Sequence, residues 1–202
     1  IDSIMQTGTA FVVSNYLGGG STFPAYKGIV IRLSGGGPNY VLVMQSGGTG
    51  FYAGGGDSHF PAGNYYKNSV QTQNYEPFAD YKLTTAFSNS VPAAVSLIIG
   101  NDPYDGAACY WNGDIAEIIL YDTILDSANR YKVEQYLYDK YAPAVNLGSD
   151  RASICPVLLD AGARFTSYLW STGATTQTIT VNTTDTCWVS VTDIFGRNST
   201  DT

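Results

Sequence analysis

Short apolar runs separated by glycine-rich segments fill most of this chain. Runs of strand length bounded by glycine clusters are typical of a β-sandwich or barrel. They predict strands over residues 10–16, 28–33, 40–45, 81–87, 94–99 and 114–121, and again over 157–159, 167–170, 176–181 and 187–191. The segment 61–77 is polar, rich in Tyr and Asn and without a period, so we expect a long surface loop there.

The run at 114–121 is apolar on both strand faces, which predicts a central strand covered on both sides. One face carries Ile115, Ile119 and Tyr121, and the other carries Ala116, Ile118 and Leu120. A helix is predicted next, with Asp126 as its N-cap and Pro143 beyond its end. Its apolar stripe consists of Val133, Tyr136, Leu137 and Tyr141. We expect this helix, residues 126–141, on the outside or edge of the sandwich.

Composition changes after the helix. Residues 142–150 spell APAVNLGSD, and beyond them Thr, Ser and Val dominate while the helical pattern vanishes. The expected organisation is a first domain over 1–142, a linker over 143–150 and a second domain over 151–202.

Composition and charge narrow the class of protein. Only 13% of the 202 residues are charged, with 22 Gly and 16 Tyr, which fits a folded β-rich extracellular protein with uncharged loops. The net charge of −7 argues against a nucleic-acid partner. Since no apolar run approaches the roughly 20 residues of a membrane span, we expect no membrane insertion. No signal peptide is visible and Ile1 is not a natural start, so we expect a fragment whose targeting segment lies outside it.

Residues near the end of the first domain resemble a known family. The run GDIAEIILYD at 113–122, followed by Leu125, Asp126, Arg130, Val133, Glu134, Tyr136, Leu137, Lys140 and Tyr141, is similar to the end of bacterial concanavalin-A-like (laminin-G-like) lectin domains. Residues 97–101 resemble the preceding IGN strand of that family. The resemblance implies an all-β fold, a jelly-roll sandwich closed by one C-terminal helix.

The second domain resembles another family. The run YLWSTGATTQTITV at 168–181, with CP at 155–156, LDAG at 159–162 and WVSVTD at 188–193, is similar to Ig-like (PKD-like) repeats. Such repeats occur in large surface adhesins of gliding bacteria that are cargo of type IX secretion. The resemblance implies an Ig-like β-sandwich, incomplete at its C-terminus, a secreted cell-surface location, and secretion or surface-anchoring machinery as partners.

Catalysis finds little support in the sequence. His59 is the only histidine, and its neighbours Asp57 and Ser58 cannot form a triad, which needs residues converging from separate segments. A glycoside hydrolase needs two carboxylates facing one cleft. Asp114 and Glu117 stand at odd spacing and so point to opposite strand faces. We therefore expect a protein that is not an enzyme, with glycoside hydrolysis as a remote alternative.

Two binding sites are predicted between the last strands of the first domain. Asn101, Asp102 and Asp105 gather the hard oxygen ligands that Ca²⁺ takes, although an ordinary Asx-rich turn has the same pattern. Tyr104, Trp111 and Asn112 combine stacking rings with an amide, as carbohydrate binding requires. The alternative is that these rings pack over a sandwich edge.

Cysteines and short motifs add two further hypotheses. Three cysteines leave at least one unpaired. Cys155 and Cys187 flank Trp170 as an Ig-domain pair flanks its core Trp, which makes them a candidate disulfide, while Cys109 is expected to be a buried small side chain. Asp-Ser/Thr-apolar triplets resembling the O-glycosylation signal of gliding bacteria place candidate sites at Ser3, Thr123 and Ser127.

Two classes of function remain open. One is an extracellular, non-enzymatic adhesion module that binds surface glycans. The other is a structural spacer in a stalk or filament, whose partners are neighbouring domains of the same large protein.

Overall fold

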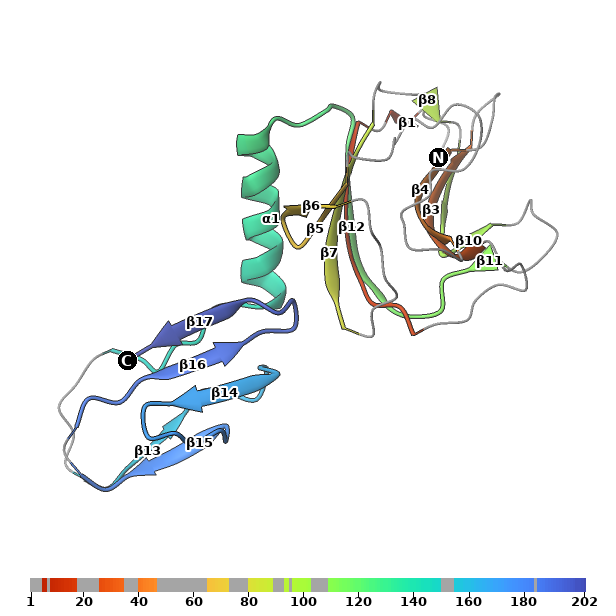
Figure 1. Cartoon of the computed structure of the whole chain (residues 1–202). Coiled ribbons are helices and arrows are strands. Elements are labelled where there is room, and N and C mark those ends of the chain that lie inside the picture. The colour runs from red at the N-terminus through yellow and green to blue at the C-terminus, as the bar shows by residue number, and fades with distance from the viewer. Residues whose placement is uncertain are drawn as a thin grey trace. The chain divides into compact units, whose positions relative to one another are not determined.

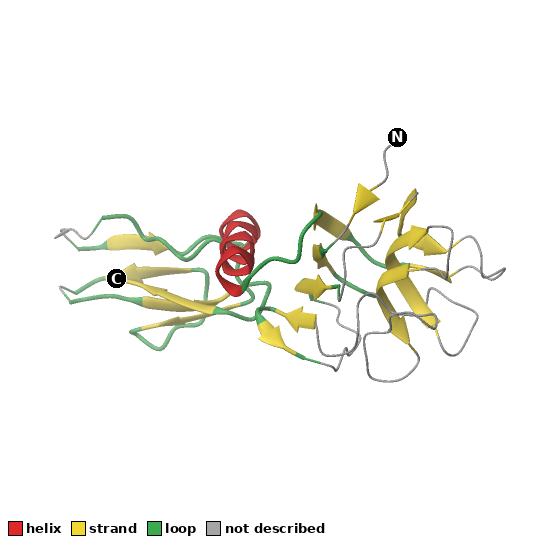
Figure 2. Ribbon diagram, turned by 90° about the horizontal axis from the view of Figure 1, so that it is seen from above, coloured by secondary structure: helices red, strands yellow, loops and turns green. Residues whose placement is uncertain are grey.

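The computed structural model is mostly β-sheet with a single helix among its described residues, which agrees with the predicted all-β class (Figure 2). The structure describes residues 5–6, 8–17, 26–34, 40–46, 65–72, 80–88, 93–94, 96–102, 109–149, 155–183 and 185–202. The contacts divide the chain into two compact units, Ile1–Gln135 and Tyr136–Thr202. This division falls inside the helix, whereas the change in composition predicted it after residue 142.

The first unit is built on a five-stranded antiparallel sheet with the order β12-β2-β7-β5-β6. Its strands are β2 (Thr9–Ser14), β5 (Tyr65–Lys67), β6 (Val70–Gln71), β7 (Lys82–Phe87) and β12 (Ile115–Tyr121). Three of them, β2, β7 and β12, confirm strands that the apolar runs predicted.

A second sheet of the first unit has the order β4-β3-β9 and lies on the side of the five-stranded sheet away from the helix (Figure 1). It contains β3 (Tyr26–Ser34), β4 (Tyr40–Ser46) and β9 (Ser96–Ile99). Two short pairs accompany it, β1 (Met5–Gln6) with β8 (Ala93–Ala94), and β10 (Asn101–Asp102) with β11 (Cys109–Tyr110). The first unit is therefore layered, as a sandwich requires.

The strand covered on both faces is β2, not β12 as the sequence predicted. All six residues of β2 are buried, and the strand lies between β12 and β7. In contrast, β12 is an edge strand of this sheet in the described part of the chain, and a register shift between Ile115 and Glu117 leaves Ala116 exposed. The prediction from the apolar pattern of β12 was wrong because a β-bulge changes which of its residues share a face.

Part of the predicted loop at 61–77 is a β-hairpin. Strands β5 and β6 pair through a turn at Asn68 and Ser69, whose φ angles of 48° and 66° suit a two-residue hairpin turn. Tyr65 is buried, and its strand pairs with β7. The Tyr/Asn-rich composition concealed a strand only three residues long.

The helix α1 (Ser127–Tyr141) begins as predicted. The Asp126 carboxylate accepts a hydrogen bond from the Asn129 backbone N–H at 2.8 Å, which confirms it as the N-cap. Further along, the fully buried Glu134 carboxylate receives Arg130 Nη1 at 3.0 and 3.1 Å and the Thr85 hydroxyl at 3.0 Å. The Arg130 guanidinium also lies 4.0 Å from the centroid of the Tyr66 ring. This network holds the start of α1 on one face of the five-stranded sheet.

The buried stripe of α1 differs in one position from the prediction. Leu137 is buried, and Val133 and Tyr141 are half-buried, but Tyr136 is 51% exposed. Tyr138 is buried instead. The spacing from 133 to 137 to 141 defines the stripe, and residue 136 lies about 100° away from 137 around the helix.

The second unit contains two small antiparallel sheets around one core. One sheet pairs β13 (Val157–Asp160) with β15 (Thr178–Val181), and the other has the order β14-β16-β17, from β14 (Ser167–Trp170), β16 (Val189–Thr192) and β17 (Asn198–Asp201). Trp170 is buried at 1% exposure in this core, as predicted, and its Nε1 donates to the Thr176 carbonyl at 2.7 Å. The core also contains Val145, Ala161, Phe165, Ile179, Val181, Val189 and Val191.

Residues 143–149, which the sequence assigns to a linker, lie against the last strand of the second unit. The Val145 N–H donates to Ser199 Oγ at 3.1 Å, and the Leu147 N–H donates to Asp201 Oδ2 at 2.5 Å. Val145 is itself a core residue. The segment is therefore part of the second unit, held by hydrogen bonds to β17 and by the burial of Val145.

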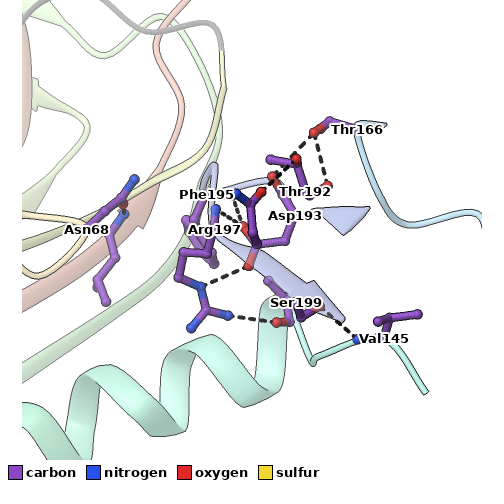
Figure 3. A network of polar contacts seen from close by, with 11 residues as sticks. Asn68, Val145, Thr166, Thr192, Asp193, Phe195, Arg197 and Ser199 are labelled. Carbon is purple, nitrogen blue, oxygen red and sulfur yellow. Dashed lines mark hydrogen bonds and ion pairs between the residues drawn. The ribbon is translucent and has the colours of Figure 1, made fainter. Parts of the chain in front are cut away.

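A polar clamp closes the β16–β17 turn (Figure 3). Asp193 accepts the backbone N–H groups of Phe195 and Arg197 and a 2.9 Å ion pair from Arg197 Nε. Arg197 also donates to the Ala142 carbonyl at 2.9 Å, and its guanidinium stacks 3.8 Å from the centroid of Tyr138. The clamp thus joins the turn to the end of α1 within the second unit.

Candidate functional site

The predicted sugar-binding Trp111 is a structural residue. Its ring is buried at 7% exposure, and its Nε1 donates to the Asn15 carbonyl at 2.8 Å. The Tyr16 ring packs against it with centroids 4.8 Å apart. A stacking platform must offer a free ring face to a sugar, and Trp111 does not. This outcome matches the alternative that the ring packs over a sandwich edge.

Asn15 ties the end of β2 to the start of β12. Its side-chain oxygen accepts the Asp114 N–H at 2.6 Å, and its own N–H donates to the Asp114 carbonyl at 3.1 Å. The Leu17 N–H donates to the Asn112 carbonyl at 2.8 Å. A side chain at Gly113 would collide with the Asn15 carbonyl, so only glycine permits this approach. The result is a rigid corner, which we call the Asn15 corner.

Polar side chains are exposed on the surface of the Asn15 corner. Asn112 and Asp114 are exposed, and the Tyr81 hydroxyl donates to Asp114 Oδ2 at 3.3 Å. Partial burial raises the pKa of Tyr81 above its ordinary value, and the nearby Asp114 carboxylate raises it further. Asn112 is therefore exposed on a rigid support, and its role as a ligand-binding amide remains a prediction.

The remaining predicted ligands of the first unit lie largely outside the described residues. Asn101 and Asp102 form β10, but their side chains are not among those described, and neither Tyr104 nor Asp105 is described at all. Among the described residues there is no group of three or more His, Cys, Asp or Glu side chains placed to hold a metal ion. The Ca²⁺ site at Asn101, Asp102 and Asp105 remains a prediction.

The second unit presents an exposed aromatic side chain that was not among the predicted site residues. Trp188 precedes β16 and is 38% exposed, and Leu169 in β14 is 49% exposed. Leu169 pairs with Ser190, and the Ser171 N–H donates to the Trp188 carbonyl at 2.9 Å, so the two apolar side chains are diagonal neighbours. Val189 and Val191 point into the core. Because side chains alternate along a strand, Trp188, Ser190 and Thr192 point outward.

The surface around Trp188 is neutral and rich in hydroxyl groups. We define the outer sheet face as the outward residues of β14, β16, β17 and their extensions: Ser167, Leu169, Ser171, Trp188, Ser190, Thr192, Asn198 and Thr200. Ser167 Oγ donates to Thr192 Oγ1 at 2.8 Å, which donates to Asn198 Oδ1 at 2.9 Å. An indole beside aligned hydroxyl and amide groups can stack on a sugar ring and hydrogen-bond its edge.

The sequence predicted the strand that carries this face but not which of its two sides is exposed. Residues 187–191 were predicted as one strand, and in the sequence CWVSV a core position for Val189 and Val191 puts Trp188 and Ser190 outside. The sequence alone could not say which of the two sets faces the core, because Trp and Val are both apolar.

Carboxylates with strong local partners serve structure in the described part of the chain. Glu134 is paired with Arg130, and Asp193 with Arg197. Hydrogen bonds from the Gln177 side chain and the Gly162 N–H hold the pKa of Asp160 below its ordinary value. Each of these groups already accepts hydrogen bonds from protein donors.

The predicted disulfide is not formed. Cys155 and Cys187 are both free thiols and half-buried. Cys155 precedes β13 in one sheet and Cys187 precedes β16 in the other, where Cys187 packs against the core that contains Trp170. The core around Trp170 is held by packing instead of a covalent bridge. The Cys109 side chain lies outside the described residues.

The predicted modification sites are accessible where they are described. Thr123 and Ser127 are exposed, at the turn between β12 and α1 and at the first residue of α1. Ser3 lies outside the described residues, as does His59. O-glycosylation at Ser3, Thr123 and Ser127 stays a prediction.

Comparisons with protein-family models, curated proteins and solved structures found no match to this chain. The single described helix is too short and too polar to cross a membrane.

Proposed function

We propose that this chain is a non-enzymatic adhesion module of a larger extracellular surface protein and that it binds neutral glycans. The carrying observation is the outer sheet face of the second unit, where Trp188 and Leu169 are exposed on the same face as a hydrogen-bonded row of polar side chains, Ser167, Thr192 and Asn198. The proposal includes a jelly-roll first unit, an Ig-like second unit and a cell-surface location, which rest on the sequence resemblances.

The charge of the face selects the ligand class. Every residue of the outer sheet face is uncharged, and the whole chain has a net charge of −7, which repels acidic sugars. Two exposed apolar side chains are too few for the apolar centre of a standard protein–protein interface. A neutral sugar chain needs one stacking ring and several hydroxyl partners, which this face offers.

The structural-spacer alternative has its own support. Residues 143–149 are pinned to β17 through Ser199 and Asp201, and the Arg197 clamp holds the end of α1 in the second unit. Such fixed segments suit a load-bearing repeat. The two alternatives differ in whether any sugar binds.

The test is a neutral-glycan array with the whole chain, in the presence of Ca²⁺ and of a chelator. The unaltered chain is expected to bind, and Trp188→Ala is expected to weaken binding by about tenfold or more, equivalent to about 1.4 kcal/mol. Tyr131→Ala removes a comparably exposed ring from α1 and is the matched control that should keep binding.

The remaining outcomes assign the site. Loss of binding in Asn112→Ala with retention in Trp188→Ala would move the site to the Asn15 corner. Loss with the chelator alone would support the Ca²⁺ site at Asn101, Asp102 and Asp105. No binding under either condition would leave the spacer function as the better explanation.

A further inference from the structure

Two hydroxyl groups inside the first unit have no hydrogen-bond partner. Ser14 in β2 and Thr84 in β7 are both fully buried, and neither Ser14 Oγ nor Thr84 Oγ1 is paired in the described structure. A buried hydroxyl without a hydrogen-bond partner destabilises the fold, and two neighbouring cases suggest one shared partner.

The register places both hydroxyls on one face of the sheet. Thr84 stands opposite Val12, and Ser14 stands opposite Lys82, so Ser14 and Thr84 are diagonal neighbours across β2 and β7. Thr85 points to the other face, where its hydroxyl binds Glu134 of α1. Ser14 and Thr84 therefore face away from α1, toward the interior between the two sheets (Figure 1).

The separation suits one bridging water molecule. Diagonal residues of an antiparallel pair have Cα atoms about 7–8 Å apart, and side chains that lean together shorten the gap. A water that bonds both oxygens at about 2.8 Å spans up to about 5.5 Å between them. Buried waters make about three hydrogen bonds to polar groups that would otherwise be unsatisfied.

Lys82 lies on the same face, directly opposite Ser14, and only 17% of its side chain is exposed. Its ammonium group forms an ion pair at 3.9 Å with the exposed Asp80 carboxylate, so its charge has a partner of its own.

We propose that the first unit binds one ordered water molecule between Ser14 Oγ and Thr84 Oγ1. The water locks β2 to β7 one residue before Asn15. It thereby stabilises the end of β2, from which the Asn15 corner begins.

Oxygen-17 relaxation dispersion, which counts long-lived waters, tests the proposal on the whole chain. Thr84→Val keeps the shape of the side chain and removes the hydroxyl, so the count should fall by one, and the melting temperature should fall by about 2–4 °C. Thr84→Ser keeps the hydroxyl and should retain the water. If Thr84→Val does not fold, Ser14→Ala replaces it, with Ser14→Thr as the hydroxyl-keeping control.

An unchanged water count in the hydroxyl-free variant overturns the proposal, whatever happens to the melting temperature. A rise in melting temperature would then show that the Thr84 hydroxyl has no hydrogen-bond partner in the native protein and destabilises it. A fall of one water in Thr84→Val but not in Thr84→Ser supports it.

Discussion

Several polar side chains of this protein are fixed by partners close to them in the chain. Asp193 accepts backbone N–H groups two and four residues ahead, and Asp160 accepts the Gly162 N–H two residues ahead. Such Asx contacts need only a short loop and a carboxylate. These contacts fix the geometry of the turn without any contribution from residues far away in the sequence.

Asp160 should titrate below ordinary aspartate. Its donors stabilise the charged form, so the folded pKa is lowered and the stabilisation is present above the unfolded pKa of about 3.9. That stabilisation is lost as the pH falls through the folded pKa. Carbon-detected NMR titration measures the value, and Gln177→Ala should return the pKa toward normal because it removes the largest cause. An Asp160 that titrates at the ordinary aspartate value of about 3.9 would contradict this prediction.

Elements are fixed partly by local signals and partly by neighbours. The N-cap at Asp126 and the stripe at Val133, Leu137 and Tyr141 were predictable because both depend on residues within one or two helical turns. The edge position of β12 was not, because pairing partners come from distant segments and a bulge shifted its faces.

The buried Glu134 should be costly to remove. Glu134→Ala leaves Arg130, whose side chain is only 15% exposed, without its counter-charge and Thr85 without its acceptor. Breaking one partner of a buried pair typically costs about 3–5 kcal/mol. Urea unfolding of the single variants and of Arg130→Ala/Glu134→Ala measures it, and the double variant should lose less than the two single losses added together. A loss under about 1 kcal/mol for Glu134→Ala would indicate that the network is not formed.

At the scale of the whole molecule, two β-rich units each have their own core. The second unit is small, and its buried centre is Trp170, surrounded by valines and Phe165. With its two cysteines free, this unit depends on packing, the Asp193–Arg197 clamp and sheet pairing.

Trp170→Ala should lower the stability of the second unit by about 3–5 kcal/mol, since it empties the centre of the core. Trp188→Ala is the matched control, because it removes the same side chain from the surface of the same unit and should change stability little. Thermal unfolding monitored by tryptophan fluorescence and circular dichroism distinguishes the two. Equal effects of the two variants would contradict the assignment of inside and outside.

The sequence by itself determined the all-β class, most strands, the helix start and the buried Trp170. Those features depend on residue periodicity, turn residues and capping within about ten residues. Only the tertiary structure decided that Trp111 is buried against Tyr16, that Trp188 is exposed, and that β2 rather than β12 is covered on both faces. The physical reason is that an aromatic or apolar residue is equally suited to a core or a surface platform, and only the packing of distant strands determines which it becomes.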